Sequence, residues 1–217
     1  METIEIQIPG VKLGVVEADG VTVGMAGPEL VREIDEVCAG LRRKFTLESL
    51  ADSEAIVSAR GMFRRWGVDA SKYRPSSEAL LRRVVQGKGL YCVSNIVDLS
   101  NLGSIETGWP YGVYNRKAIE PPVRLRLGAD SETYEGIGRR LWHLAGRPVL
   151  ADATGPFGSP ISDSTRTHIA EGVSDVLTVI YAPATASDAA LADAATKQEQ
   201  RLKMYAGASE TRTLRAS

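Results

Sequence analysis

The chain changes from helix-like to strand-like patterns at the stretch Ser94-Asn-Ile-Val-Asp-Leu-Ser-Asn-Leu-Gly-Ser-Ile-Glu-Thr-Gly108. Apolar residues recur three apart in this stretch and a glycine closes it, which predicts a helix. Helical spacing upstream predicts three earlier helices, near residues 28–44, 52–66 and 76–86. Short apolar runs downstream predict strands over 123–127, 133–137, 149–151 and 176–181. Helices first and strands later predict an α+β fold, in which a helical N-terminal half packs on a mixed or antiparallel β-sheet.

The two ends of the chain add further elements. Ile4, Ile6 and Ile8 alternate with polar residues, and the alternation resumes from residue 11, so two strands are predicted to open the sheet side by side. The alanine-rich residues 187–205 predict a C-terminal helix, and the polar residues after it are expected to fray. Residues 108–115 are interpreted as an aromatic turn. We therefore expect one α+β domain over residues 1–184, followed by a helix and polar tail over 185–217.

Composition excludes several classes of protein. The chain has 217 residues, of which 43% are hydrophobic and 24% charged, and no apolar run approaches a membrane span. Its N-terminus has no basic start followed by a long apolar stretch, so we expect a cytoplasmic protein. Two cysteines without CxxC spacing and two histidines do not make a structural zinc site or a disulfide framework. No metal and no cofactor are expected.

Positive charge is concentrated in one region. Residues 42–88 hold eleven bases against five acids, and a polyanion such as RNA would be attracted there. The alternative is that these bases only solvate the outer faces of helices. The candidate RNA-binding residues are Arg42, Arg43, Lys44, Arg64, Arg65, Arg82, Arg83 and Lys88.

Two polar stretches are candidate binding sites. Asn95, Asp98 and Asn101 follow one another three residues apart in the predicted helix, where they can hydrogen-bond a ligand or cap neighbouring backbone. Residues 155–168 form a loop too long for a hairpin, and His168 at its end is a better candidate base than His143. The known signatures of serine hydrolases, nucleotide-binding loops and zinc peptidases are missing, and Gly136-Ile-Gly138 is only a weak dinucleotide motif.

Four motifs in order carry a resemblance to a known family. They are Arg74-Pro-Ser-Ser-Glu-Ala-Leu-Leu-Arg-Arg-Val, Gly87-Lys-Gly-Leu, Asn95-Ile-Val-Asp-Leu-Ser-Asn101 and Gly108-Trp-Pro-Tyr-Gly-Val-Tyr114. Together they resemble the editing domain of the phenylalanyl-tRNA synthetase beta subunit, formed by its third and fourth (B3/B4-type) domains, and its free-standing relatives. The similarity runs from about residue 73 to 181. The rest of that large subunit is missing, so charging of tRNA is not expected.

The resemblance implies hydrolysis in trans of the ester of a mischarged tRNA, carrying tyrosine or a related amino acid. Asn95, Asp98 and Asn101 match the family's Asn-x-x-Asp-x-x-Asn pattern, and Gly108 and Pro110 match its Gly-x-Pro turn. Where the synthetase turn commonly continues with a histidine, this chain has Gly112. The glycine-rich loop whose acid reads the tyrosine hydroxyl corresponds only loosely to residues 158–163.

An aminoacyl ester is already activated, so its hydrolysis needs an oriented water and donors for the oxyanion rather than a catalytic triad. On the resemblance, Asp163 is expected to position that water or the substrate ammonium, and Ser164 and Thr167 to hold the carbonyl or ribose. Arg166 is expected to contact a phosphate, or else to pair with Asp163 or Glu171 and hold the loop.

Tyr111 and Tyr114 either line the pocket and stack the terminal adenine or pack into the sheet. The expected partner is tRNA, with no role for DNA or membranes. Two alternatives stay open: an RNA-binding module without chemistry, and a pocket for an amino-acid derivative without RNA.

Overall fold

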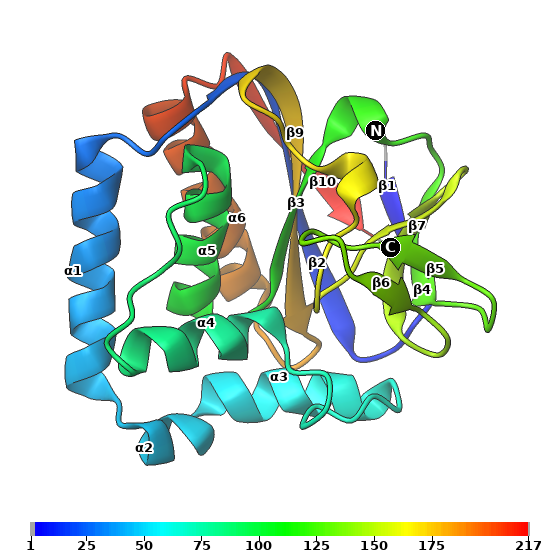
Figure 1. The fold of residues 1–217 in the computed structure, drawn as a ribbon, viewed down its shortest axis with the longest axis horizontal. Helices are drawn as coiled ribbons and strands as arrows, with labels where there is room; N and C mark the ends of the chain where they lie inside the picture. Colours follow the sequence, from blue (N-terminus) through cyan, green and yellow to red (C-terminus); the bar gives the residue numbers. More distant parts are fainter. Residues whose placement is uncertain (1–2, 217) are drawn as a thin grey trace.

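The computed structural model describes residues 3–216, and one long pair of strands organises it. β2 (Val11–Val23) and β9 (Gly172–Pro183) run antiparallel along almost their whole length, near the middle of the molecule (Figure 1). Side chains alternate across these strands. Val16 and Ile180 therefore face the helices, whereas Val15 and Val179 face a second core inside the sheet.

Most helices lie on one side of this pair, whereas α3 (Glu54–Arg65) runs beneath it and contributes Met62 and Phe63 to the second core (Figure 1). The other helices are α1 (Pro28–Lys44), α2 (Leu47–Ala51), α4 (Ser76–Val85), α5 (Asn95–Thr107) and α6 (Asp188–Ala206). The predicted helices are confirmed, and the short α2 is an addition. Gly108 ends α5 in the left-handed conformation (φ 75°), as its position predicted.

The main sheet has eight strands in the order β3-β9-β2-β10-β1-β4-β7-β8. The remaining strands in it are β1 (Thr3–Ile6), β3 (Tyr111–Asn115), β4 (Val123–Leu127), β7 (Pro148–Asp152), β8 (Gly155–Gly158) and β10 (Glu210–Ala216). β5 (Thr133–Glu135) and β6 (Leu141–His143) pair separately, and two 3₁₀ turns, η1 (Arg116–Ala118) and η2 (Thr165–Thr167), lie in connections. The α+β prediction is confirmed.

Three local predictions are wrong. The N-terminal strands are not neighbours, because β10 lies between β1 and β2 and hydrogen-bonds to both. Residues 210–216 therefore form an interior strand of the sheet instead of a frayed tail. Their polar side chains gave no strand pattern, but their backbone pairs with both neighbouring strands. Residues 111–115 form the edge strand β3, which pairs with β9. No helix within residues 3–216 combines the length and the apolar character needed to cross a membrane.

The two edge strands of the sheet approach each other. The rings of Tyr114 on β3 and Phe157 on β8 meet edge to face, with centroids 5.0 Å apart. The sheet thus curls around the second core, and the chain segment that follows β8 is brought next to β3. This closure positions the site described next.

Candidate active site

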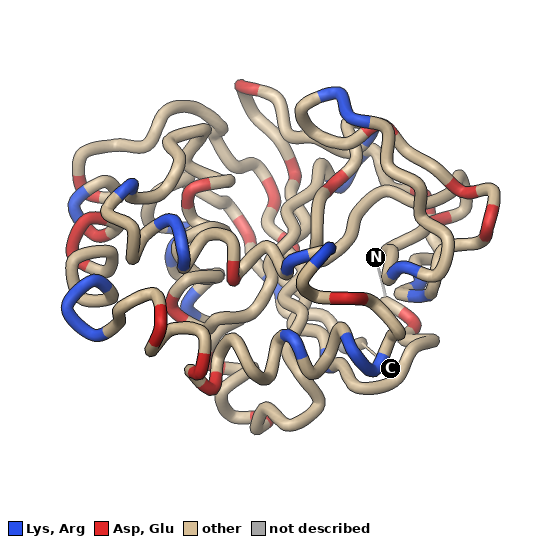
Figure 2. Tube along the Cα trace, turned by 60° about the horizontal axis from the view of Figure 1, so that its bottom comes forward, with Lys and Arg blue, Asp and Glu red and all other residues tan. Residues whose placement is uncertain are grey.

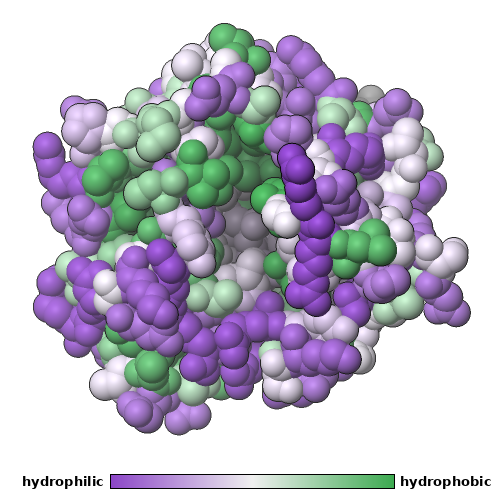
Figure 3. Space-filling view, in the orientation of Figure 1, coloured by the Kyte–Doolittle hydropathy of each residue, from purple (hydrophilic) through white to green (hydrophobic). Residues whose placement is uncertain are grey.

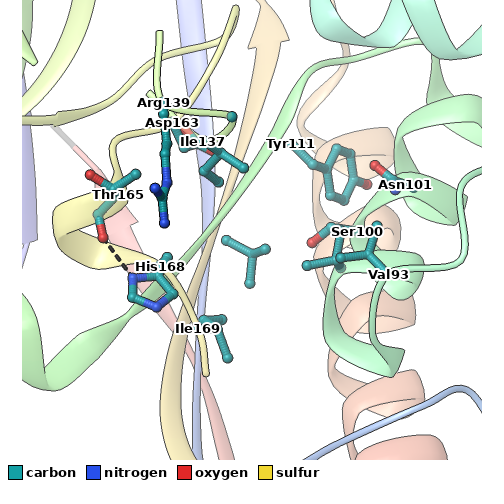
Figure 4. Close-up of a pocket in the computed structure, with 13 residues that line it drawn as sticks. Val93, Ser100, Asn101, Tyr111, Ile137, Arg139, Asp163, Thr165, His168 and Ile169 are labelled. Carbon is teal, nitrogen blue, oxygen red and sulfur yellow. Dashed lines mark hydrogen bonds between the residues drawn. The ribbon is translucent and has the colours of Figure 1, made fainter. Parts of the chain in front are cut away.

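A cavity of about 610 Å³ lies between the helical half of the molecule and the loops of the sheet. α5 and the preceding Val93 form one wall, and β3 forms part of the floor. The tip of the β5–β6 hairpin and residues 163–169 form the opposite wall (Figure 4). On the corresponding face, Figure 3 shows a hollow near the centre with hydrophobic residues around part of its rim.

Asp163 is the one carboxylate that residues 3–216 contribute to the wall of this cavity. Its Oδ1 accepts hydrogen bonds from the Tyr114 hydroxyl (2.8 Å) and the Ser159 amide (3.2 Å). Its Oδ2 has no hydrogen-bond partner among residues 3–216. Burial raises the pKa of the Asp163 carboxyl to about 7, although both hydrogen bonds act to lower it. The group is therefore partly protonated near neutral pH.

Two glycines make room for the tyrosine that holds Asp163. A Cβ at either Gly112 or Gly158 would collide with the hydroxyl of Tyr114. The Tyr114 ring is fully buried between them, and its hydroxyl also lies 3.2 Å from that of Tyr181. Gly112 was expected to line the pocket, but it lies behind the lining and leaves space for the Tyr114 hydroxyl. Tyr114 does not line the cavity, but it fixes the orientation of the carboxylate that does.

The residues that follow Asp163 do not all face the cavity. Ser164 is buried and its hydroxyl caps η2 by accepting a hydrogen bond from the Arg166 amide (3.1 Å). Thr167 is fully buried and donates to the Phe157 carbonyl (3.3 Å). Neither lines the cavity, whereas Thr165 and His168 do. The expected group of Asp163, Ser164 and Thr167 is therefore not brought together at one surface.

Arg166 also points away from the cavity. Its guanidinium makes a two-pronged ion pair with Asp152 (2.9 and 3.0 Å) and donates to the carbonyls of Ala118 and Gly155. These contacts agree with the prediction that Arg166 holds the loop. Its ion-pair partner, however, is Asp152 and not Asp163 or Glu171. The Asp152 side chain is fully buried, so the pair anchors the segment that carries Asp163.

Sequence reasoning missed the β5–β6 tip. Ile137, Gly138 and Arg139 line the cavity, and Arg139 adopts a positive φ of 61°. The Ile137 amide donates to the Asp163 carbonyl (3.0 Å), which ties the tip to the opposite segment. The glycines at 136 and 138 could have indicated this tight turn, which was considered only as a nucleotide motif. Within residues 3–216, no cluster of His, Cys, Asp and Glu is placed to hold a metal ion.

His168 lines the cavity wall. Its Nδ1 lies 2.6 Å from the Thr165 carbonyl (dashed line in Figure 4). When Nδ1 carries the proton for that contact, the neutral ring has its lone pair on Nε2.

On α5, the predicted polar triplet separates. Asn95 is buried and ties three elements together: its Oδ1 accepts from the Gly24 amide, and its Nδ2 donates to the carbonyls of Thr22 and Tyr205. Asp98 is buried, accepts from the Val93 amide (3.0 Å), and burial raises its pKa. Only Asn101 reaches the cavity.

The cavity face of α5 consists of Val97, Ser100 and Asn101. The Ser100 hydroxyl is buried and has no partner among the described residues. The family-like turn after this helix is structural: Gly108 lies against Ala55, and the Pro110 carbonyl accepts from the Tyr181 amide (2.9 Å).

The predicted basic residues divide into two groups. Arg82 is half-buried and paired with Glu78 (2.8 Å), and the Arg83 guanidinium lies 3.9 Å from the centre of the Tyr91 ring. The others are exposed and have no acidic partner among residues 3–216: Arg42, Arg43, Lys44, Arg64, Arg65 and Lys88. Figure 2 shows lysines and arginines interspersed with acids along the helical half rather than gathered in one block.

Comparisons with known proteins place the chain in a family. An N-terminal fragment of the phenylalanyl-tRNA synthetase β-subunit from Pyrococcus horikoshii is structurally similar, with a TM-score of 0.47 and 11% sequence identity. The similarity covers 99% of this chain and 51% of the fragment, so the chain spans about half of that fragment's length. No curated protein matches. The model of the B3/4 domain family matches residues 58–206, more than half of the chain. The protein therefore belongs to the B3/4 domain family.

Proposed function

We propose that the protein hydrolyses the ester bond of a mischarged aminoacyl-tRNA, carrying tyrosine or a related amino acid. The observation that carries the proposal is Asp163: a carboxylate in the wall of a 610 Å³ cavity, with one oxygen held by Tyr114 and the other without a hydrogen-bond partner among residues 3–216. Membership of the B3/4 family adds the expectation of tRNA as the partner.

Asp163 is suited to act as a general base. A base is most effective when its pKa lies near the working pH, and that of Asp163 is raised to about 7. Its Oδ2 takes a proton from a water molecule as the water oxygen attacks the ester carbonyl. The tetrahedral intermediate then collapses, the bond to the ribose oxygen breaks, and that oxygen receives the proton. The products are the free amino acid and uncharged tRNA.

The remaining walls suit the rest of the substrate. Val93 and Val97 on the α5 side and Val113 on the β3 floor give the cavity an apolar lining, which favours an apolar or aromatic acyl side chain. Arg139 on the β5–β6 tip is the cation in the cavity wall, on the same side as Asp163 (Figure 4). A cation there stabilises negative charge developing on the carbonyl oxygen or holds the terminal phosphate.

The decisive experiment incubates the protein with a panel of mischarged and correctly charged tRNAs and follows loss of the ester. Wild type is expected to clear at least one mischarged tRNA faster than buffer. Asp163→Asn keeps the side-chain shape and the Tyr114 hydrogen bond but loses the base, so its rate should fall about 10²- to 10⁴-fold. Asp193→Asn, at an exposed position of α6, is the matched control and should leave the rate unchanged.

Failure of wild type on every tRNA contradicts the proposal, and equal rates for both variants contradict the role of Asp163. The second candidate is an RNA-binding module without chemistry, which the six exposed, unpaired bases favour. It predicts salt-sensitive tRNA binding by wild type and Asp163→Asn alike, with no ester loss.

A further inference from the structure

Tyr91 is an exposed aromatic residue with one face already covered by a cation. The Arg83 guanidinium lies 3.9 Å from the centre of its ring, while 53% of Tyr91 stays accessible to solvent. The Arg83 guanidinium makes no ion pair or hydrogen bond among the described residues, and its Nε is buried without a partner there. The stack therefore holds this guanidinium, and its charge is not neutralised by an acid.

The stack is adjacent in the chain to the cavity wall. Residues 86–94 connect the end of α4 to the start of α5, and Val93 in this segment lines the cavity (Figure 4). Tyr91 precedes Val93 by two residues, at most about 7 Å along the backbone. Lys88, in the same segment, is exposed.

The end of α1 adds charge beside this segment. α1 packs against α4, and Figure 1 shows the C-terminal ends of both helices on the same side of the molecule. The α1 end carries Arg42, Arg43 and Lys44, all exposed. Lysine and arginine side chains and one aromatic ring thus follow one another from the ends of α1 and α4 towards the residue that lines the cavity, Val93.

We infer that the Tyr91–Arg83 stack is a platform for a base of the single-stranded 3′ end of tRNA, next to the aminoacylated nucleotide in the cavity. This rests on the proposed function and names the contact that delivers the substrate. Single-stranded RNA is recognised by aromatic side chains that stack on bases and by cations that follow the phosphates, and both are present here. A ring with a cation on one face offers its other face to a base.

The first test measures binding of a short single-stranded RNA ending in CCA by fluorescence anisotropy, so it does not depend on hydrolysis. Tyr91→Ala is expected to weaken binding about 5- to 100-fold, the usual cost of removing one stacked base. Tyr91→Phe keeps the ring and should bind like wild type. Because Tyr91 is exposed, both variants should remain folded, with thermal unfolding of Tyr91→Phe unchanged and that of Tyr91→Ala lowered only slightly by loss of the Arg83 stack.

The control is a second tyrosine–arginine pair with the same ring-to-guanidinium distance, in which Tyr73 is half-buried and its hydroxyl also accepts a hydrogen bond from Arg147. The Arg147 guanidinium also lies 3.9 Å from the ring centre of Tyr73, but this pair borders a different hollow, lined by Gly67, Asp69 and Gly146. Tyr73→Ala should leave RNA affinity unchanged at a temperature where the variant is folded. Unchanged affinity for Tyr91→Ala, or equal losses for Tyr91→Ala and Tyr73→Ala, would overturn the platform.

The second test separates the platform from the cavity. With aminoacyl-tRNA, Tyr91→Ala should raise KM and leave kcat nearly unchanged. With an aminoacylated adenosine, which fills only the cavity, its kcat/KM should equal that of wild type. Equal losses on both substrates would place Tyr91 in the cavity chemistry and overturn the platform. If wild type hydrolyses neither substrate, the proposed function fails, and the binding test still decides the platform.

Discussion

The two walls of the cavity differ in how their polar residues are used. On α5, residues at 97, 100 and 101 line the cavity, which is the i, i+3, i+4 face of a helix. On the opposite wall, Asp163, Thr165 and His168 line it, while Ser164 and Thr167 turn inward. A polar motif therefore does not define a surface by itself. The local backbone geometry decides which of its members share one.

The largest expected effect on stability comes from the raised pKa of Asp163 in the wall opposite α5. Its folded pKa of about 7 lies above its ordinary value of 3.8, so the folded state binds more protons than the unfolded state between those values. Its contribution to stability is fully present below pH 4 and is lost as pH rises through 7, by up to about 4 kcal/mol.

Urea unfolding from pH 4 to 8 measures this effect. Relative to wild type, Asp163→Asn should become more stable as pH rises, and Asp193→Asn should run parallel to wild type. A constant difference between wild type and Asp163→Asn across this range would mean that Asp163 titrates normally in the folded protein.

The next largest effect on stability is expected for Asn95, the member of the α5 motif that ties the helix to neighbouring backbone. Asn95→Ala removes hydrogen bonds to the backbone of Thr22, Gly24 and Tyr205, and leaves these partly buried backbone groups without the Asn95 side chain. We expect a loss of about 2–3 kcal/mol in the free energy of unfolding. Denaturant unfolding checks it, with Asn95→Asp as a control that keeps the acceptor oxygen. A variant as stable as wild type would show that α5 is not anchored through this side chain.

A smaller loss is expected at the anchor of the opposite wall. Arg166→Met leaves the buried Asp152 carboxylate without its guanidinium, and because Arg166 is about one-third exposed we expect about 1–2 kcal/mol. Arg166→Lys keeps the charge but not the two-pronged geometry and should recover only part of the stability. Thermal and urea unfolding measure both. Full recovery by lysine would show that charge alone, without the fork, holds the segment.

The smallest effect on stability is expected for Asn101, the member of the α5 motif that faces the cavity. Its side chain makes no hydrogen bond within residues 3–216, so Asn101→Ala should change the free energy of unfolding by less than about 0.5 kcal/mol. Ester hydrolysis, however, should slow if the amide contacts substrate. A destabilisation as large as that of Asn95→Ala would contradict the distinction between a structural Asn95 and a cavity-facing Asn101.

The predicted polar triplet shows where sequence reasoning stops. Residues three apart on a helix rotate by about 60° at each step, so the first and third members point about 120° apart. The triplet was correctly placed on a helix, but the helix could not aim all three at one ligand. Asn95 instead donates hydrogen bonds to the backbone of β2 and α6. The motif itself gives no information about where those two elements lie.

Arg166 and β10 show the same limit at longer range. The sequence offered Asp163 and Glu171 as nearby acids for Arg166, but the curl of the sheet brings Asp152 of β7 to it. β10 has a polar sequence, and its place between β1 and β2 follows from backbone pairing that side-chain periodicity does not report.

The sequence alone determined the helices, most of the strands, the α+β class and the family resemblance, because apolar periodicity and glycine stops are local signals. It also singled out Asp163, although not the tyrosine and two glycines that hold it. Only the tertiary structure decided which side chains share the cavity, since that depends on the register of β3 with β9 and on the closure of the sheet. Those pairings join residues far apart in the chain, and no local pattern encodes the distance between them.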